Sequence, residues 1–255
     1  MIKGCGHGRL SSLLLFFINL VARYHGLLFH WVDRFITVSD FVNLQHLKSG
    51  FPEEKMMVNN NGIDIGSLDR AGYAKPWKER SGVAFAGRIS VAKGAEVIKQ
   101  LISEIKLPFH IIGSGPEQGE LQQFCLEKGY DNVVFWGGQP REKTLEILGS
   151  VVCTVVPSQC GDSFPTVALE SMALGTPVVA SNLGGLPGLV GKGGGTIVNP
   201  NEYEQFGDSV LRYLNNITIA EADGINCQQY VRGNLSMEVR GRALVQIYEG
   251  LLSKQ

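Results

Sequence analysis

Short apolar runs alternate with helical patterns along most of the chain. Each run is bounded by glycine, proline or polar residues and has the length of a buried strand. The runs are residues 83–86, 109–112, 133–135, 151–156, 177–180 and 196–198. Apolar residues recur at helical spacing over residues 92–105, 117–127, 141–148 and 166–174. Because strands this apolar are buried on both faces and are joined by helices, they predict a parallel, doubly wound α/β sheet.

The segments on either side of this repeat have weaker patterns. Residues 35–39 predict a strand followed by a helix that Ser39 or Asp40 caps. Residues 56–58 predict another strand, which runs into an Asn-Gly turn. Helical spacing returns over residues 203–214 and 239–252.

Residues 10–22 form a strongly apolar run near the N-terminus, interrupted by Asn19. The run is shorter than the roughly 20 residues that a helix needs to span a bilayer. It predicts a helix that is buried against the rest of the protein. The alternative is an amphipathic helix that touches a membrane surface.

Composition and charge narrow the function classes. The 255 residues include 23 Lys and Arg against 24 Asp and Glu, a net charge of -1, so no global field attracts nucleic acid. None of the five Cys belongs to a C-x-x-C pair, which favours a reducing compartment such as the cytoplasm. The chain has neither a D-x-D pair nor an H-E-x-x-H motif, so we expect no bound metal.

Ligands of doubly wound sheets bind beyond the carboxyl ends of the strands. In this sequence those ends carry small residues that let a ligand approach the backbone, together with the segment 157–166. The small residues are Gly87, Gly113, Ser114, Gly115, Gly137 and Gly138.

Two cations follow the first strand of the repeat. Arg88 and Lys93 lie where this strand gives way to a helix, and cations beside helix N-terminal amides suit a diphosphate. The spacing does not match a Walker A loop. The alternative is that both are solvated loop cations.

The segment after the fourth strand is the most informative. Ser163 could cap a helix that has Pro165 in its first turn, leaving amides near Phe164 and Thr166 free to bind an anion. Glu170 lies four residues after Thr166 and shares its helix face, where a carboxylate could accept hydrogen bonds from vicinal ribose hydroxyls. Asp162 could hold a second hydroxylated group. The alternative is that Asp162 caps the helix and Glu170 is a surface charge.

These motifs, in this order and spacing, resemble the donor-binding half of GT-B glycosyltransferases of retaining family 4, from about residue 32 to the C-terminus. The segments that carry the resemblance are residues 33–39, 60–64, 85–89, 93–94, 113–116 and 162–181. The resemblance implies transfer of a sugar, with retention, from a UDP- or GDP-sugar to a glycan or lipid-linked acceptor, without a metal ion or cofactor.

The resemblance also implies roles for residues. Arg88 and Lys93 would hold the donor diphosphate and stabilise the leaving group, Asp162 would contact the sugar, and Glu170 would hold the ribose. The backbone near Gly137 and Gly138 would lie beside the base. The remaining donor-binding positions would be Gly87, Gly113, Ser114, Gly115, Ser163, Phe164, Pro165 and Thr166. Three positions depart from the family pattern: Asp162 replaces Glu, Pro165 replaces Gly, and Gly188 replaces Glu.

The resemblance divides the chain into two parts. Residues 1–31 resemble the last helix and linker of an N-terminal acceptor domain, and residues 32–255 form the donor-binding domain. The acceptor domain is then either truncated or supplied by a separate chain. We expect a cytoplasmic protein, with peripheral contact at the inner face of a membrane as an open alternative. The competing function is a non-catalytic nucleotide-sugar-binding module or scaffold.

Overall fold

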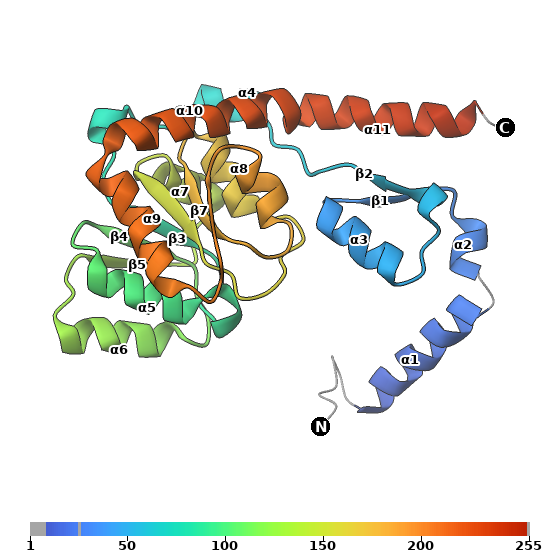
Figure 1. Ribbon diagram of the computed structural model, residues 1–255, viewed down its shortest axis with the longest axis horizontal. Helices are drawn as coiled ribbons and strands as arrows, with labels where there is room; N and C mark the ends of the chain where they lie inside the picture. The colour runs from blue at the N-terminus through green and yellow to red at the C-terminus, as the bar shows by residue number, and fades with distance from the viewer. Residues whose placement is uncertain (1–8, 25–26, 254–255) are drawn as a thin grey trace.

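A computed structural model describes residues 9–24 and 27–253. Its main sheet has six parallel strands in the order β5-β4-β3-β6-β7-β8 (Figure 1). The strands are β3 (Val83–Ala86), β4 (Phe109–Ile112), β5 (Val133–Gly137), β6 (Cys153–Val156), β7 (Val178–Ser181) and β8 (Thr196–Val198). This is the predicted doubly wound α/β fold, and each predicted strand of the repeat is confirmed with small changes at its ends.

Helices cover both faces of this sheet, and each face has its own core. One face packs against α5 (Ala95–Glu104), α6 (Gln118–Lys128) and α9 (Tyr203–Asn215). The other packs against α4 (Ile65–Ala71), α7 (Arg141–Leu148), α8 (Thr166–Ala173), the π-helical turn η4 (Pro187–Gly191) and α10 (Ile217–Asn234). Alternate residues of one strand serve the two cores: Val83 and Phe85 face the first, and Ala84 faces the second.

The order of the strands fixes where a ligand can bind. From β3 the chain moves outward to β4 and β5, and it then returns to place β6 on the other side of β3. Loops that leave β3 and β6 therefore diverge, and a crevice opens between them at the carboxyl edge of the sheet.

A small lobe lies beside the main domain (Figure 1). It consists of the parallel pair β1 (Phe35–Thr37) and β2 (Met56–Val58) with α3 (Asp40–Lys48). α1 (Arg9–Tyr24) and α2 (Leu27–Trp31) precede it, and α11 (Met237–Leu252) extends toward it from α10. The Asn59 side-chain amide, just after β2, donates a hydrogen bond to the Arg240 carbonyl of α11 at 3.3 Å. The shorter turns are η1 (Glu53–Lys55), η2 (Trp77–Glu79) and η3 (Val91–Lys93).

The prediction that residues 10–22 form a buried helix is wrong in its packing. The segment is helical, but its large apolar side chains are exposed, from 50% for Leu20 to 62% for Leu14. The main domain does not cover this surface, because α1 projects away from it (Figure 1). Within the ranges that the structure describes, no helix has both the length and the apolarity needed to cross a bilayer.

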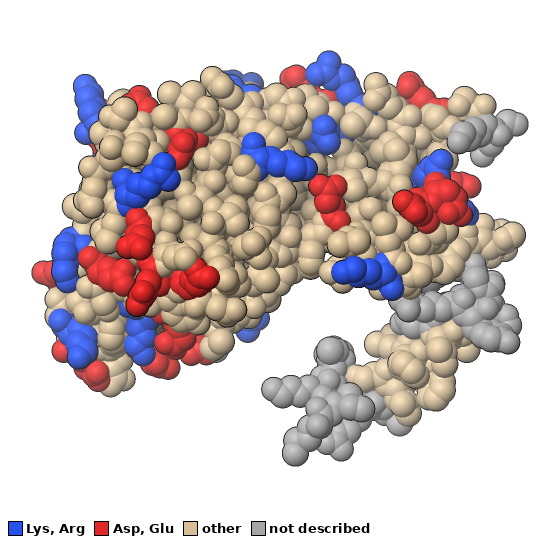
Figure 2. Space-filling model, viewed as in Figure 1, with Lys and Arg blue, Asp and Glu red and all other residues tan. Residues whose placement is uncertain are grey.

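Charged side chains are dispersed over the surface. On the face shown in Figure 2, Lys and Arg side chains lie among Asp and Glu side chains over the main domain. This mixture fits the net charge of -1.

Candidate functional site

The predicted glycine-rich strand ends meet at the carboxyl edge of the sheet. They line an open groove of about 680 Å³ beyond β3, β4 and β5. Its lining residues are Gly87, Arg88, Gly113, Ser114, Gly115, Pro116 and Gly138. Gly137 lies directly beneath, where its carbonyl accepts a hydrogen bond from the Gly113 amide at 2.7 Å.

Close backbone packing explains why these positions are glycine. Gly113 has φ of +118°, and a Cβ at this position would lie 2.1 Å from the Gly87 carbonyl oxygen. A Cβ at Gly115 would lie 2.0 Å from the Ile89 carbonyl oxygen. Any side chain at either position would therefore separate the loops that form the groove.

A second pocket adjoins this groove, since Gly87 lines both. It has a volume of about 320 Å³ and lies between the ends of β3 and β6 and the start of α8. The predicted site residues that line it are Lys93, Asp162, Ser163, Phe164, Pro165 and Thr166. The topology thus brings Lys93 together with the segment 162–166, which is distant from it in the sequence, and leaves Arg88 on the wall of the adjoining groove.

Lys93 and Asp162 form an ion pair inside this pocket. The other carboxylate oxygen of Asp162 accepts a hydrogen bond from the Ser158 hydroxyl at 2.7 Å. Because the Asp162 side chain is only 16% exposed, the Lys93 ammonium compensates a largely buried charge. An anionic ligand could replace Asp162 as the partner of the Lys93 ammonium, and the Ser158 hydrogen bond would then still hold the Asp162 side chain in place.

Arg88 remains available to a ligand. It is exposed on the wall of the groove, and it has no hydrogen-bond or ion-pair partner among residues 9–24 and 27–253. Its guanidinium can therefore meet a phosphate without breaking an existing bond.

The N-terminus of α8 faces the second pocket. The prediction that Ser163 caps this helix is wrong: α8 follows Pro165, and no side chain accepts a hydrogen bond at its N-terminus. The amides of Thr166 and Val167 lack intrahelical acceptors in the first turn, and both residues line the pocket. Phe164 is 9% exposed and packs in the core, which anchors the loop before the helix.

Glu170 lies one turn further along α8 and is 15% exposed. It forms an ion pair with Arg141 at 2.8 Å. Sequence reasoning missed Arg141, although it begins the helix that follows the Gly137-Gly138 strand end and so belongs to the same edge of the sheet. With this pair and the Lys93–Asp162 pair, both candidate carboxylates are matched by cations.

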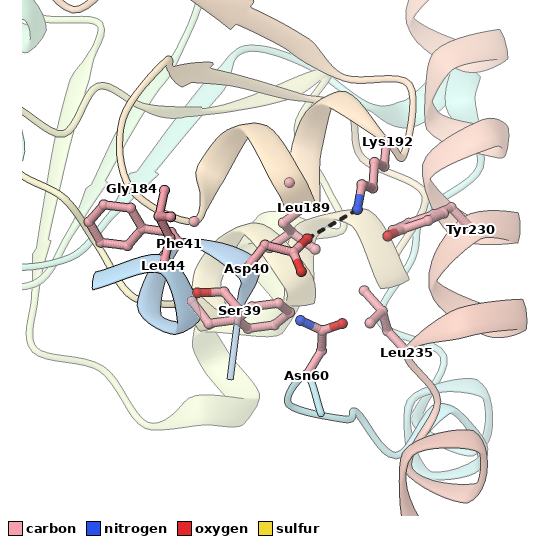
Figure 3. A pocket seen from close by; sticks show the side chains of 13 residues that line it. Ser39, Asp40, Phe41, Leu44, Asn60, Gly184, Leu189, Lys192, Tyr230 and Leu235 are labelled. Atoms are coloured by element: carbon pink, nitrogen blue, oxygen red, sulfur yellow. Dashed lines mark hydrogen bonds and ion pairs between the residues drawn. The ribbon is translucent and has the colours of Figure 1, made fainter. Parts of the chain in front are cut away.

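A third cavity, of about 310 Å³, lies between α3, η4 and α10 (Figure 3). The Lys192–Asp40 ion pair, at 3.3 Å, crosses it, and Ser39, Asn60 and Tyr230 are among its polar lining residues. No sequence pattern indicated this cavity, because its walls come from segments distant in the chain. In the ranges that the structure describes, no three His, Cys, Asp or Glu side chains gather to bind a metal.

Comparison with known proteins agrees with this architecture. A family model for group 1 glycosyl transferases matches residues 74–225. The D-inositol 3-phosphate glycosyltransferase of Mycolicibacterium smegmatis is 31% identical over 199 residues, which cover 71% of this chain and 45% of that relative. The chain therefore spans less than half the length of this curated relative.

Solved structures share the fold at lower sequence identity. Sucrose-phosphate synthase from Thermosynechococcus elongatus has a TM-score of 0.70 and 24% identity, over 86% of this chain and 58% of that one. Anabaena HepE in complex with UDP and glucose has a TM-score of 0.73 and 19% identity, over 85% of this chain and 63% of that one. The family model matches more than half of the residues of this chain. The chain therefore belongs to the group 1 glycosyltransferases, which have the GT-B fold.

Proposed function

We propose that this chain is the donor-binding half of a retaining, family 4 glycosyltransferase and that it binds a UDP- or GDP-sugar without a metal ion or cofactor. The observation that carries the proposal is the convergence of three anion-binding features on two adjoining cavities. These features are the free Arg88 guanidinium, the Lys93 ammonium and the open N-terminus of α8.

The diphosphate would lie between the two cations and the first amides of α8. Arg88 would approach it from the groove, and Lys93 would exchange its bond to Asp162 for one to a phosphate oxygen. As the glycosidic bond breaks, negative charge grows on the leaving diphosphate. Cations and amides that are already fixed in place would stabilise this charge at little reorganisation cost.

The two carboxylates would hold the sugars on either side of the diphosphate. Asp162, released by Lys93 and held by Ser158, would accept hydrogen bonds from hydroxyls of the transferred sugar. Glu170 would accept hydrogen bonds from the ribose. The base would then lie toward Gly137 and Gly138, beside the start of α7.

The acceptor side of the reaction is also a proposal. We place a glycan or lipid-linked acceptor on an acceptor domain whose last helix and linker lie in residues 1–31, of which the structure describes 9–24 and 27–31. The rest of that domain would belong to the same protein or to a separate chain. The exposed apolar side chains of α1 support contact with such a domain. They would equally suit a cytoplasmic protein that contacts the inner face of a membrane peripherally.

Calorimetric titration with UDP and with GDP tests the proposal. We expect one nucleotide to bind at millimolar concentration or better, and Lys93→Ala to weaken it about tenfold, as expected when a charge-assisted hydrogen bond is lost. Lys192→Ala is the matched control, because Lys192 also pairs with an Asp but lies outside the two donor-site cavities. Absence of binding by either nucleotide would overturn the proposal. Binding without transfer, even with an acceptor domain added, would favour the non-catalytic module.

A further inference from the structure

The loop that carries Asp162 is tied to the small lobe. The Ser39 hydroxyl donates a hydrogen bond to the Ser163 carbonyl at 2.7 Å, across 124 residues of sequence. The same hydroxyl accepts a hydrogen bond from the Val42 amide at 3.3 Å and so caps α3. Ser39 is 4% exposed, so both bonds are shielded from water. A single side chain therefore joins the start of α3 to the loop between β6 and α8.

The turn after β7 holds the same loop from another direction. The Gly185 amide donates a hydrogen bond to the Asp162 carbonyl at 2.7 Å. A Cβ at Gly185 would lie 2.2 Å from the Ser163 carbonyl oxygen. The carbonyls of Asp162 and Ser163 are thus fixed by Gly185 and Ser39, and the turn must be free of side chains to come this close.

Aromatic packing supports this connection. A Cβ at Gly161 would lie 2.8 Å from the Phe41 ring, so α3 packs directly against the loop. Figure 3 shows Ser39, Phe41 and Gly184 around the third cavity. Phe164 lines both this cavity and the second pocket, the one that holds Lys93 and Asp162 and that we call the donor pocket. Ser39 lines the third cavity but not the donor pocket. It therefore acts on the donor pocket through the loop and does not touch a ligand bound there.

We propose that Ser39 is a positioning residue for donor binding: through its hydrogen bond to the Ser163 carbonyl, the small lobe holds the loop that presents Asp162 and the α8 amides to the donor. This inference rests on the proposed function, because it assigns the loop to the diphosphate and sugar. It predicts that Ser39 affects the diphosphate end of the ligand and leaves the nucleoside end, near Glu170 and Gly138, unaffected.

The test compares UDP with uridine (GDP with guanosine if the wild-type chain prefers GDP). UDP is titrated by calorimetry and uridine by NMR against Ser39→Ala, Ser39→Thr and Ser236→Ala. Ser236 is the matched control, since it caps α11 through the Val239 amide at the same 3.3 Å. Thermal melting of Ser39→Ala and Ser236→Ala shows whether both variants fold, because each loses one helix cap.

We expect Ser39→Ala to weaken UDP about fivefold, as for one lost buried hydrogen bond, and to leave uridine unchanged. Ser39→Thr, which keeps the hydroxyl, is expected to retain most of the UDP affinity, and Ser236→Ala to retain all of it. Unchanged UDP affinity in Ser39→Ala, or an equal loss for UDP and uridine, would overturn the inference. A wild-type chain that binds no nucleotide would instead overturn the proposed function itself.

Discussion

The proposed contact between Glu170 and the ribose can be tested by replacing one carboxylate oxygen. Glu170→Gln preserves the size of the side chain but removes its charge and one of its acceptors. A hydrogen bond to a charged group contributes about 1.5–3 kcal/mol, which corresponds to about a tenfold to hundredfold loss of UDP affinity. The existing ion pair with Arg141 offsets little of this loss, because Arg141 is 54% exposed and water already solvates its guanidinium.

Calorimetry with UDP and 2′-deoxy-UDP isolates this contact. We expect the wild-type chain to prefer UDP, and we expect Glu170→Gln to lose most of that preference because the carboxylate no longer receives the 2′-hydroxyl. Glu146→Gln is the control, since Glu146 also pairs with a cation, Lys143 at 2.9 Å, on an exposed part of α7. If Glu170→Gln weakened both nucleotides equally, the reasoning that places the ribose at Glu170 would be refuted.

Two further predictions concern stability. Arg80, 9% exposed, donates hydrogen bonds to the Leu174 and Gly175 carbonyls, and burial lowers its pKa to about 10. Arg80→Met leaves these acceptors unpaired and is expected to lower the free energy of unfolding by about 2–4 kcal/mol in urea titrations; a loss below about 0.5 kcal/mol would contradict this. Burial also lowers the pKa of His110, whose Nδ1 accepts a hydrogen bond from the Trp136 indole at 3.1 Å. As the pH falls below 6.5, His110 takes up a proton in the unfolded chain before it does so in the folded chain. The free energy of unfolding is therefore expected to decrease as the pH falls from 6.5, and to decrease less steeply in His110→Gln. An equal pH dependence in the two proteins would show that burial does not lower the pKa of His110.

The main sheet could be predicted because its signals are local. Each strand is a short apolar run, and each crossover helix has apolar positions at helical spacing, so the pattern alone gives the parallel sheet. α10 escaped prediction because its buried positions are mostly small. They are Ala220, Gly224, Cys227 and Val231, which follow helical spacing but lack the large apolar side chains that mark an amphipathic helix.

The positions of the site residues could be predicted better than their contacts. Strand ends place Arg88, Lys93 and Asp162 at one edge, because all parallel strands point the same way. Their pairing depends on rotamers and on loops that pack across the sheet. The Arg141–Glu170 ion pair and the Ser39–Ser163 hydrogen bond span 29 and 124 residues, and no local pattern encodes either.

The packing of α1 failed prediction for a different reason. An apolar run of this length predicts burial, but it does not specify what buries it. In the described part of the chain, Leu14 and Leu20 stay at least half exposed. The apolar run therefore predicted the helix correctly but did not indicate what the helix packs against.

A crystal structure of the chain with UDP tests the central claim most directly. We expect the diphosphate to lie between Arg88, Lys93 and the first amides of α8, with the ribose hydroxyls on Glu170 and the base beside Gly138. We also expect the Lys93–Asp162 ion pair to open when the phosphate binds. UDP bound in the cavity between α3 and α10, or bound at the strand ends with Lys93 still paired to Asp162 and away from the phosphates, would contradict the claim.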